Sequence, residues 1–269
     1  MKPICIYHGG CDDGFAAALV VWLAHAKDIE LFPASYGKPA PDVTGRKVII
    51  VDFSYKREEM EILAGQAESI LMLDHHKSAM LDMIGFEHDN CRIVFDMERS
   101  GAMMAWDHFK PWGTTGLEFI RYIQDRDLWK KELVGSEAFT MGLRSYPQDL
   151  DLWQKFFKDG PMDLIQEGIT VLRYYRQLVE QVKSIAFEAE IDGIKVPVCN
   201  SSFALASDVA GELAEGKPFA AVFYDTPDGY VYSLRSRGDG MDVSQIAIKF
   251  GGGGHKNASG FKSKIKVHQ

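Results

Sequence analysis

The sequence predicts an α/β fold whose N-terminal part is a mostly parallel, doubly wound sheet. Short apolar runs alternate with helical patterns through the first third of the chain, which is typical of parallel strands joined by right-handed crossovers. The β-branched run at 46–53 (RKVIIVDF) suits a strand buried on both faces. A different rhythm of shorter elements begins after residue 190, which predicts a second and smaller α/β domain.

The elements of the first part follow from these patterns in order. Ser100 stands where a helix N-cap is expected. We expect strands at 2–7, 46–53, 69–73 and 92–95, and helices at 15–26, 56–68, 100–109 and 116–128.

A long helical pattern at 161–187, with apolar residues at steps of three to four, separates the two parts. We interpret it as a connector, and therefore predict a first domain at 1–160, a helical connector at 161–190 and a second domain at 191–269. In the second domain we expect a strand at 194–198, a helix at 204–215, a hairpin of 219–224 with 230–235, and a helix at 243–250.

Charge and composition exclude some classes of protein. The 269 residues include 30 Lys and Arg against 38 Asp and Glu, a net charge of −8, which excludes a basic protein that wraps long duplex nucleic acid. A small anionic substrate held through metal ions is still compatible with this charge. The sequence shows neither a membrane-spanning run nor a signal-peptide pattern, and its four scattered cysteines form no CxxC pair. We therefore expect a soluble, cytoplasmic protein with reduced thiols.

Acidic and histidine side chains directly follow three predicted strands. Because ligands of open α/β sheets bind at the carboxyl ends of the strands, we expect these side chains to converge. Each has an ordinary alternative as a turn or cap residue, but clustered carboxylates repel unless a cation neutralises them, and Asp with His favours Mn²⁺ or Mg²⁺. The residues are His8, Cys11, Asp12 and Asp13 after the first strand, Asp52 after the second, and Asp74, His75 and His76 after the third.

Two motifs resemble those of one known family. The stretch 73–76 (LDHH) resembles the signature of the DHH phosphoesterase superfamily, and 250–261 (FGGGGHKNASGF) resembles the substrate-binding motif of the accompanying DHHA1 domain. Both stand in the expected order, and the resemblance covers nearly the whole chain. It implies that the first part is a DHH catalytic domain and the second a DHHA1 domain.

The resemblance also implies a set of site residues. Two divalent ions would bind in the DHH domain, with Mn²⁺ expected and Mg²⁺ or Co²⁺ as alternatives. His76 would face the scissile phosphate, and Asp74 would orient the cluster from behind the ligands. The implied metal ligands are His8, Asp13, Asp52, His75 and one acidic residue near the end of an apolar stretch. Asp52 would bridge the two metals and also count as a catalytic residue. For the acidic residue, Asp125 is preferred over Asp127.

The first motif departs from the family pattern, because Cys11 stands where the family commonly has an aspartate. Cys11 could bind a metal or lie beside it without binding, or Asp12 could substitute. A thiolate ligand would favour softer metals than Mn²⁺.

In the second domain, a glycine run would let the backbone approach an anion closely, although it could also be only a flexible turn. Arg235 matches an arginine that the family uses for a substrate phosphate, and Arg237 is a weaker candidate. The implied substrate-binding residues are Gly252, Gly253, Gly254, His255, Lys256 and Arg235.

The sequence therefore predicts a metal-dependent phosphodiesterase, exonuclease-like, that hydrolyses short oligonucleotides or cyclic (di)nucleotides with a water activated by two metal ions. It is expected to act as a monomer or homodimer. Two alternatives stay open: a hydrolase of pyrophosphate or polyphosphate, which the glycine motif argues against, and a non-catalytic nucleotide or RNA binder whose metal site is degenerate at Cys11.

Overall fold

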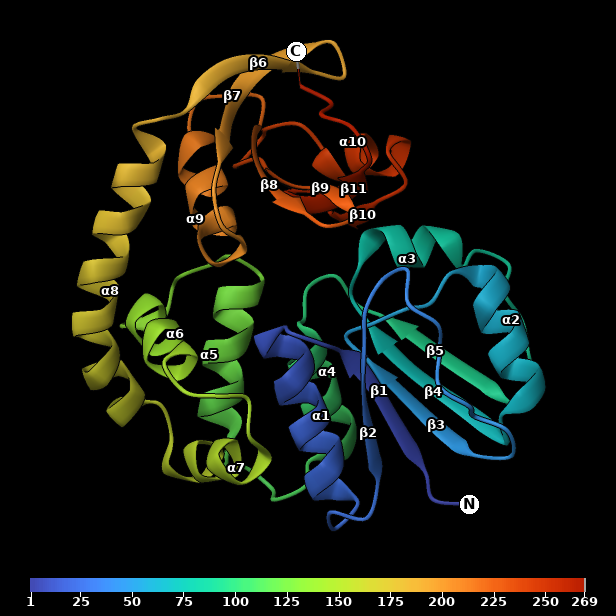
Figure 1. The fold of residues 1–269 in the computed structure, drawn as a ribbon. Coiled ribbons are helices and arrows are strands. Elements are labelled where there is room, and N and C mark those ends of the chain that lie inside the picture. Colours follow the sequence, from blue (N-terminus) through green and yellow to red (C-terminus); the bar gives the residue numbers. More distant parts are fainter. Residues whose placement is uncertain (269) are drawn as a thin grey trace. The chain divides into compact units, whose positions relative to one another are not determined.

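The computed structural model describes residues 1–268 and divides into two compact units, with the boundary between Leu172 and Arg173. This boundary falls inside the long helix α8 (Met162–Lys183) and within the segment expected to connect the two domains (Figure 1). Among the described residues, no helix combines the length and apolar character that crossing a bilayer requires.

The first unit contains a five-stranded sheet in which every pair is parallel, in the order β2-β1-β3-β4-β5. This confirms the predicted mostly parallel α/β fold. Strand β2 was not expected from the sequence; it carries Pro33 and lies at the edge of the sheet, where a missing N–H is tolerated. The strands are β1 (Ile4–His8), β2 (Glu30–Ala34), β3 (Lys47–Val51), β4 (Ser69–Asp74) and β5 (Cys91–Phe95).

Alternate residues of these strands face two separate hydrophobic cores, as the period of two in a strand requires. Cys5 and Val51 belong to one core, whereas their neighbours Ile6 and Ile50 belong to the other. The helices of this unit are α1 (Asp12–Ala24), α2 (Arg57–Gln66), α3 (Lys77–Asp82), α4 (Gly101–Phe109), α5 (Leu117–Asp127), α6 (Ser136–Arg144) and α7 (Leu150–Asp159).

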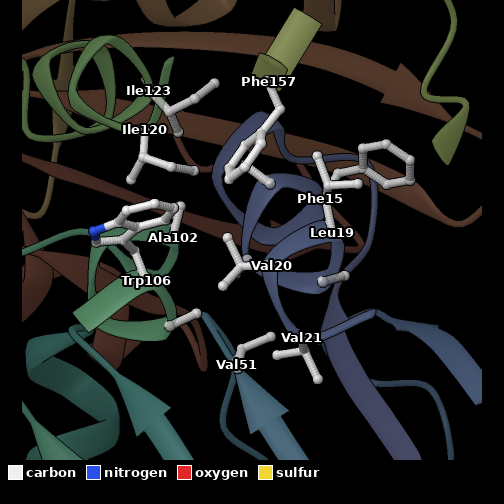
Figure 2. Close-up of a cluster of buried hydrophobic side chains, with 14 of the residues drawn as sticks. Phe15, Leu19, Val20, Val21, Val51, Ala102, Trp106, Ile120, Ile123 and Phe157 are labelled. Atoms are coloured by element: carbon white, nitrogen blue, oxygen red, sulfur yellow. The ribbon is translucent and has the colours of Figure 1, made fainter. Parts of the chain in front are cut away.

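Helix α1 is the centre of the first core, and it is buried on nearly all sides from Phe15 to Val21. Figure 2 shows its Val20 among Trp106 of α4, Ile120 of α5 and Phe157 of α7. A helix surrounded in this way must be apolar all round, which explains its uninterrupted run of Ala, Leu and Val. The burial fixes the start of α1, and with it the acidic residues of its first turn.

The second unit contains a six-stranded mixed sheet in the order β10-β11-β9-β8-β7-β6, in which only the β7–β8 pair is parallel. The expected hairpin is present as β8 and β9. Strand β6 was not predicted, because the helical pattern was read through to residue 187, whereas α8 ends at Lys183. The elements are β6 (Phe187–Ile191), β7 (Ile194–Asn200), α9 (Phe203–Leu213), β8 (Ala220–Thr226), β9 (Gly229–Arg235), α10 (Val243–Lys249), β10 (Gly253–His255) and β11 (Ala258–Ser263).

Candidate metal centre

The parallel register brings three strand ends side by side. Tyr7 of β1 pairs with Val51 of β3, which pairs with Leu73 of β4. The next residue on each strand is therefore His8, Asp52 or Asp74, and these three positions are neighbours at the carboxyl edge of the sheet. The topology thus produces the convergence that the sequence predicted.

Asp52 occupies the middle of this edge and is 1% exposed. Its Oδ1 lies 3.0 Å from Nε2 of His75, and its Oδ2 lies 3.6 Å from Nδ1 of His8. Burial opposes ionisation of Asp52, but the hydrogen bond with His75 and the nearby imidazole of His8 outweigh it and bring the pKa of Asp52 well below its usual value. Its φ of +55° is uncommon for a residue with a side chain, and such strained backbone is found where a side chain must be aimed.

Asp13 joins the cluster from the first turn of α1. Its Oδ2 accepts a 2.6 Å hydrogen bond from the N–H of Gly101, and its Oδ1 accepts a 3.1 Å bond from the N–H of Ala102. These donors form the start of α4, where the helix dipole favours an anion. Burial, together with the charges of Asp52 and Asp127, nevertheless raises the pKa of Asp13 well above its usual value. The surroundings of Asp13 therefore carry too little positive charge to favour its ionised form.

Gly101 lets α4 begin directly against the cluster. A Cβ at this position would overlap the Cβ of Asp52 and lie 3.0 Å from Oδ2 of Asp13. Ser100, the expected N-cap, accepts a 3.3 Å hydrogen bond from the N–H of Met103 and so fixes the first turn. Sequence reasoning identified the cap but missed Gly101, whose signal was a glycine immediately after a capping serine.

Asp74 organises the two histidines that follow it. Its Oδ1 accepts a 2.8 Å hydrogen bond from the N–H of His75 and lies 2.7 Å from Nδ1 of His76. Burial disfavours protonation of His76, but Asp74 raises the pKa of His76 above its usual value. Burial acts in the same way on His75, and the hydrogen bond to Asp52 with the nearby carboxylates raises its pKa to about 10.

The structure places the side chains of Asp125 and Asp127 in different surroundings. Oδ2 of Asp127 lies 3.5 Å from Nε2 of His75. Asp125 instead accepts hydrogen bonds from the N–H groups of Glu132 and Leu133, at 2.9 and 3.4 Å, and so closes the loop after α5. The structure therefore places Asp127 in the cluster, and it reverses the order of preference drawn from the sequence.

The structure also distinguishes Cys11 from Asp12. Oδ2 of Asp12 is paired at 2.6 Å with Nε of Arg144 on α6, so this carboxylate is held by a salt bridge. Burial and the charges of Asp52, Asp127 and Asp13 raise the pKa of the Cys11 thiol well above its usual value. Cys11 thus lies near the carboxylates, and their negative charges oppose its ionisation.

The donor set fits divalent cations. Two groups of ligand atoms, each lying within 4.8 Å of one another, share Asp52: one adds Asp13 and His75, and the other adds His8 and His76. Oδ2 of Asp52 and Oδ2 of Asp127 are buried without a hydrogen-bond donor. Buried carboxylate oxygens that lack donors are expensive unless a cation is present, and oxygen with imidazole ligands suits Mn²⁺ or Mg²⁺.

In the second unit, the glycine motif is the β10–β11 hairpin. A Cβ at Gly254, which has φ +136°, would lie 2.6 Å from the carbonyl oxygen of Ala258, so the hairpin itself requires a glycine there. Ala258 pairs with His255 on one side and with Arg235 on the other. The register therefore brings two of the predicted substrate-binding residues to one place.

Arg235 is held in position by neighbouring serines. Its Nη2 donates to Oγ of Ser207 at 2.5 Å, and its Nη1 donates to Oγ of Ser233 at 3.1 Å. Arg237, the weaker candidate, forms an ion pair at the surface, in which its Nη1 lies 3.8 Å from Oε2 of Glu215. Lys256 is exposed, and its carbonyl oxygen accepts a 2.8 Å hydrogen bond from the N–H of Val243. Gly252 and Gly253 lie in the same hairpin segment and are partly exposed.

Comparison with solved structures identifies this architecture. The DHH domain of a protein described as a member of a family of ribosomal proteins matches 97% of this chain and 82% of its own length, with a TM-score of 0.60 and 13% identity. The chain has the DHH-domain fold. The pGpG-specific phosphodiesterase PggH of Vibrio cholerae, aligned over 98% of this chain and 94% of its own, has a TM-score of 0.51 and 14% identity.

The DHH fold of this chain also matches RecJ of Thermus thermophilus, solved in complex with Mn²⁺. The match covers 97% of this chain and 49% of RecJ, with a TM-score of 0.52 and 15% identity. By sequence, an uncharacterized protein of Acanthamoeba polyphaga mimivirus is 29% identical over 286 aligned residues that cover 96% of this chain. The chain spans 66% of the length of that relative. No family model matches the sequence.

Proposed function

We propose that this DHH-fold chain is a metal-dependent phosphodiesterase that hydrolyses short oligonucleotides or cyclic (di)nucleotides. The observation that carries the proposal is the pair of donor groups that share the buried Asp52 at the carboxyl ends of β1, β3 and β4. A site of this kind can hold two cations close together, an arrangement that suits the displacement of a phosphate ester.

The proposed ligands are five side chains of the first unit, among which Asp52 would contribute to both donor groups. Mn²⁺ is the proposed metal, supported by the donor chemistry and by the Mn²⁺ complex of the similar RecJ structure. When bound, the ions supply Lewis acidity: they lower the pKa of a water and offset phosphoryl charge. The ligand set is His8, Asp13, Asp52, His75 and Asp127.

Groups that contact the proposed ligands and His76 hold these side chains in position. Asp74 holds Nδ1 of His76, which orients the imidazole, and the raised pKa of His76 favours its cationic form. A cationic imidazole there would donate a hydrogen bond to a phosphoryl oxygen as charge develops on it. The N–H groups at the start of α4 hold Asp13 in place.

The second unit is proposed to bind the substrate. Arg235 carries a guanidinium suited to bidentate phosphate contact and is fixed by Ser207 and Ser233. His255 and Lys256, with the backbone of 252–254, would add donors from the β10–β11 hairpin. A net charge of −8 favours short substrates over long nucleic acid, and PggH, a pGpG phosphodiesterase of similar fold, supports a dinucleotide-sized substrate. Four cysteines without disulfides support a cytoplasmic setting.

The test is Mn²⁺-dependent hydrolysis of a 5′-labelled dinucleotide, a five-mer, cyclic di-AMP, 2′,3′-cyclic AMP and pyrophosphate, each with an EDTA control. The proposal predicts release of mononucleotides from the short oligomers, abolished by EDTA and restored by Mn²⁺. Phosphate released from pyrophosphate alone would instead make the chain an anhydride hydrolase. Silence with several metals, from protein shown to be folded, would favour the non-catalytic binder.

A further inference from the structure

Tyr36 lies at the metal centre because of strand pairing. Ala34, the last residue of β2, is the register partner of His8 at the end of β1, and its carbonyl oxygen accepts a 2.8 Å hydrogen bond from the N–H of Gly9. The chain beyond Ala34 therefore leaves the sheet beside His8.

A tight turn then presents the Tyr36 side chain. The N–H of Lys38 donates to the carbonyl oxygen of Ser35 at 3.1 Å, which makes Tyr36 and Gly37 the central residues of a β-turn. Gly37 has φ +77°, as the third position of a type II turn requires. Tyr36 is thus held on a short, defined turn.

The Tyr36 ring packs against Phe53 and is still about half exposed. Its centroid lies 4.8 Å from that of Phe53 at an interplanar angle of 32°, and 5.6 Å and 6.5 Å from the ring centroids of His8 and His76, both in edge-to-face arrangements. Phe53 is fully buried, whereas Tyr36 is 48% exposed. A large aromatic ring that is fixed on one face and exposed beside a candidate catalytic cluster is a platform for a flat partner.

We propose that the Tyr36 ring is the stacking face for a nucleobase next to the scissile phosphate, and so contributes to the choice of nucleotide substrates over simple phosphates. This inference rests on the proposed phosphodiester hydrolysis. In a nucleotide, a ribose separates the phosphate from the base. The Tyr36 ring is likewise set apart from the proposed metal site by one side chain, because it packs against the ring of His8, one of the proposed metal ligands. Stacking accepts any base, so the residue selects for the presence of a base and not for its identity.

The test compares Tyr36→Leu, Tyr36→Phe and the matched control Tyr174→Leu, which removes another exposed tyrosine. Each protein, shown to be folded by its thermal transition, is assayed on a dinucleotide and on two analogues that each lack one base. Tyr36→Leu should lower kcat/KM on the dinucleotide by roughly 5- to 150-fold, mainly through KM, as loss of one stacked base predicts. Tyr36→Phe and Tyr174→Leu should stay near the wild-type value.

The analogues make the outcome decisive. On the analogue that lacks the stacked base, the wild type should fall to the level of Tyr36→Leu, and the variant should lose nothing more. An equal loss by Tyr36→Leu on all three substrates, an equal loss by Tyr36→Phe, or no loss at all would overturn the inference.

Binding of AMP, measured by calorimetry, separates this inference from the proposed function. If the wild type turns over none of the three substrates, the proposed function fails, and AMP binding still decides on Tyr36. Weaker binding by Tyr36→Leu but not by Tyr36→Phe supports the stacking face, whereas equal binding by all the proteins overturns it.

Discussion

The metal centre of the first unit and the glycine motif of the second differ in what holds their residues in place. In the first unit, Asp13, Asp52, Asp74 and His75 are at most 1% exposed, and the site consists of buried charge at strand ends. In the second unit, the β10 residues Gly253–His255 are partly exposed, and Gly252 and Gly254 are needed because strands approach closely. The first region therefore has a buried donor set that suits a cation, whereas the second depends on backbone shape and presents donors to solvent.

The largest expected effect is on the buried charge. Asp52→Asn keeps the shape of the side chain but removes the charge shared by both donor groups, so we expect Mn²⁺ affinity and hydrolysis to fall by more than about 100-fold. Calorimetry and the dinucleotide assay measure the two losses. Asp89→Asn, the same change at an exposed aspartate, is the control. Wild-type turnover by Asp52→Asn would contradict the metal centre.

The second largest effect is expected from a substitution that crowds the same site. Gly101→Ala places a methyl group against Asp52, and we expect a loss of roughly 1–3 kcal/mol in the free energy of unfolding together with weaker Mn²⁺ binding. Gly65→Ala on α2, where nothing lies within 4 Å, should stabilise by up to about 1 kcal/mol. Urea unfolding of both variants measures the contrast. Equal stabilities would show that α4 does not begin tightly against Asp52.

The second unit should respond in substrate binding alone. Arg235→Gln removes a guanidinium held by Ser207 and Ser233, and the lost charged hydrogen bonds predict an increase in KM of roughly 10- to 100-fold. The dissociation constant for Mn²⁺ should not change. A variant that lost Mn²⁺ affinity would break the division of roles between the two regions.

The last prediction concerns the pH dependence of metal binding. Hydrogen bonding to Asp52 and the surrounding carboxylates overcome burial to hold the pKa of His75 at about 10, so the imidazole is protonated at neutral pH before a cation binds. It must lose that proton to become a ligand. Mn²⁺ affinity should therefore rise with pH between 6 and 8, by about tenfold per unit for each proton released. Calorimetry in buffers of different ionisation enthalpy counts the protons, and no proton release would contradict this assignment.

Sequence patterns predicted the fold class and the strand-end cluster because both follow from local periodicity and from the rule that parallel strands end at one edge. They could not separate Asp125 from Asp127. Residues two positions apart on a helix differ by about 200° around its axis. Only tertiary packing decides which of the two faces the cluster.

Tyr36 was missed for a related reason. Its place beside His8 depends on β2, an edge strand interrupted by Pro33 that no periodicity indicated. Gly101 likewise matters through a contact with Asp52, which is distant in the sequence.

Metal stoichiometry is the decisive measurement for the candidate metal centre. Wild-type protein and Asp52→Asn, equilibrated with Mn²⁺ and freed of excess ion, would be compared by elemental analysis and by anomalous scattering from crystals. We expect two Mn²⁺ per chain in the wild type and loss of at least one in the variant. A wild-type chain that binds no Mn²⁺, or a variant that keeps both ions, would contradict it.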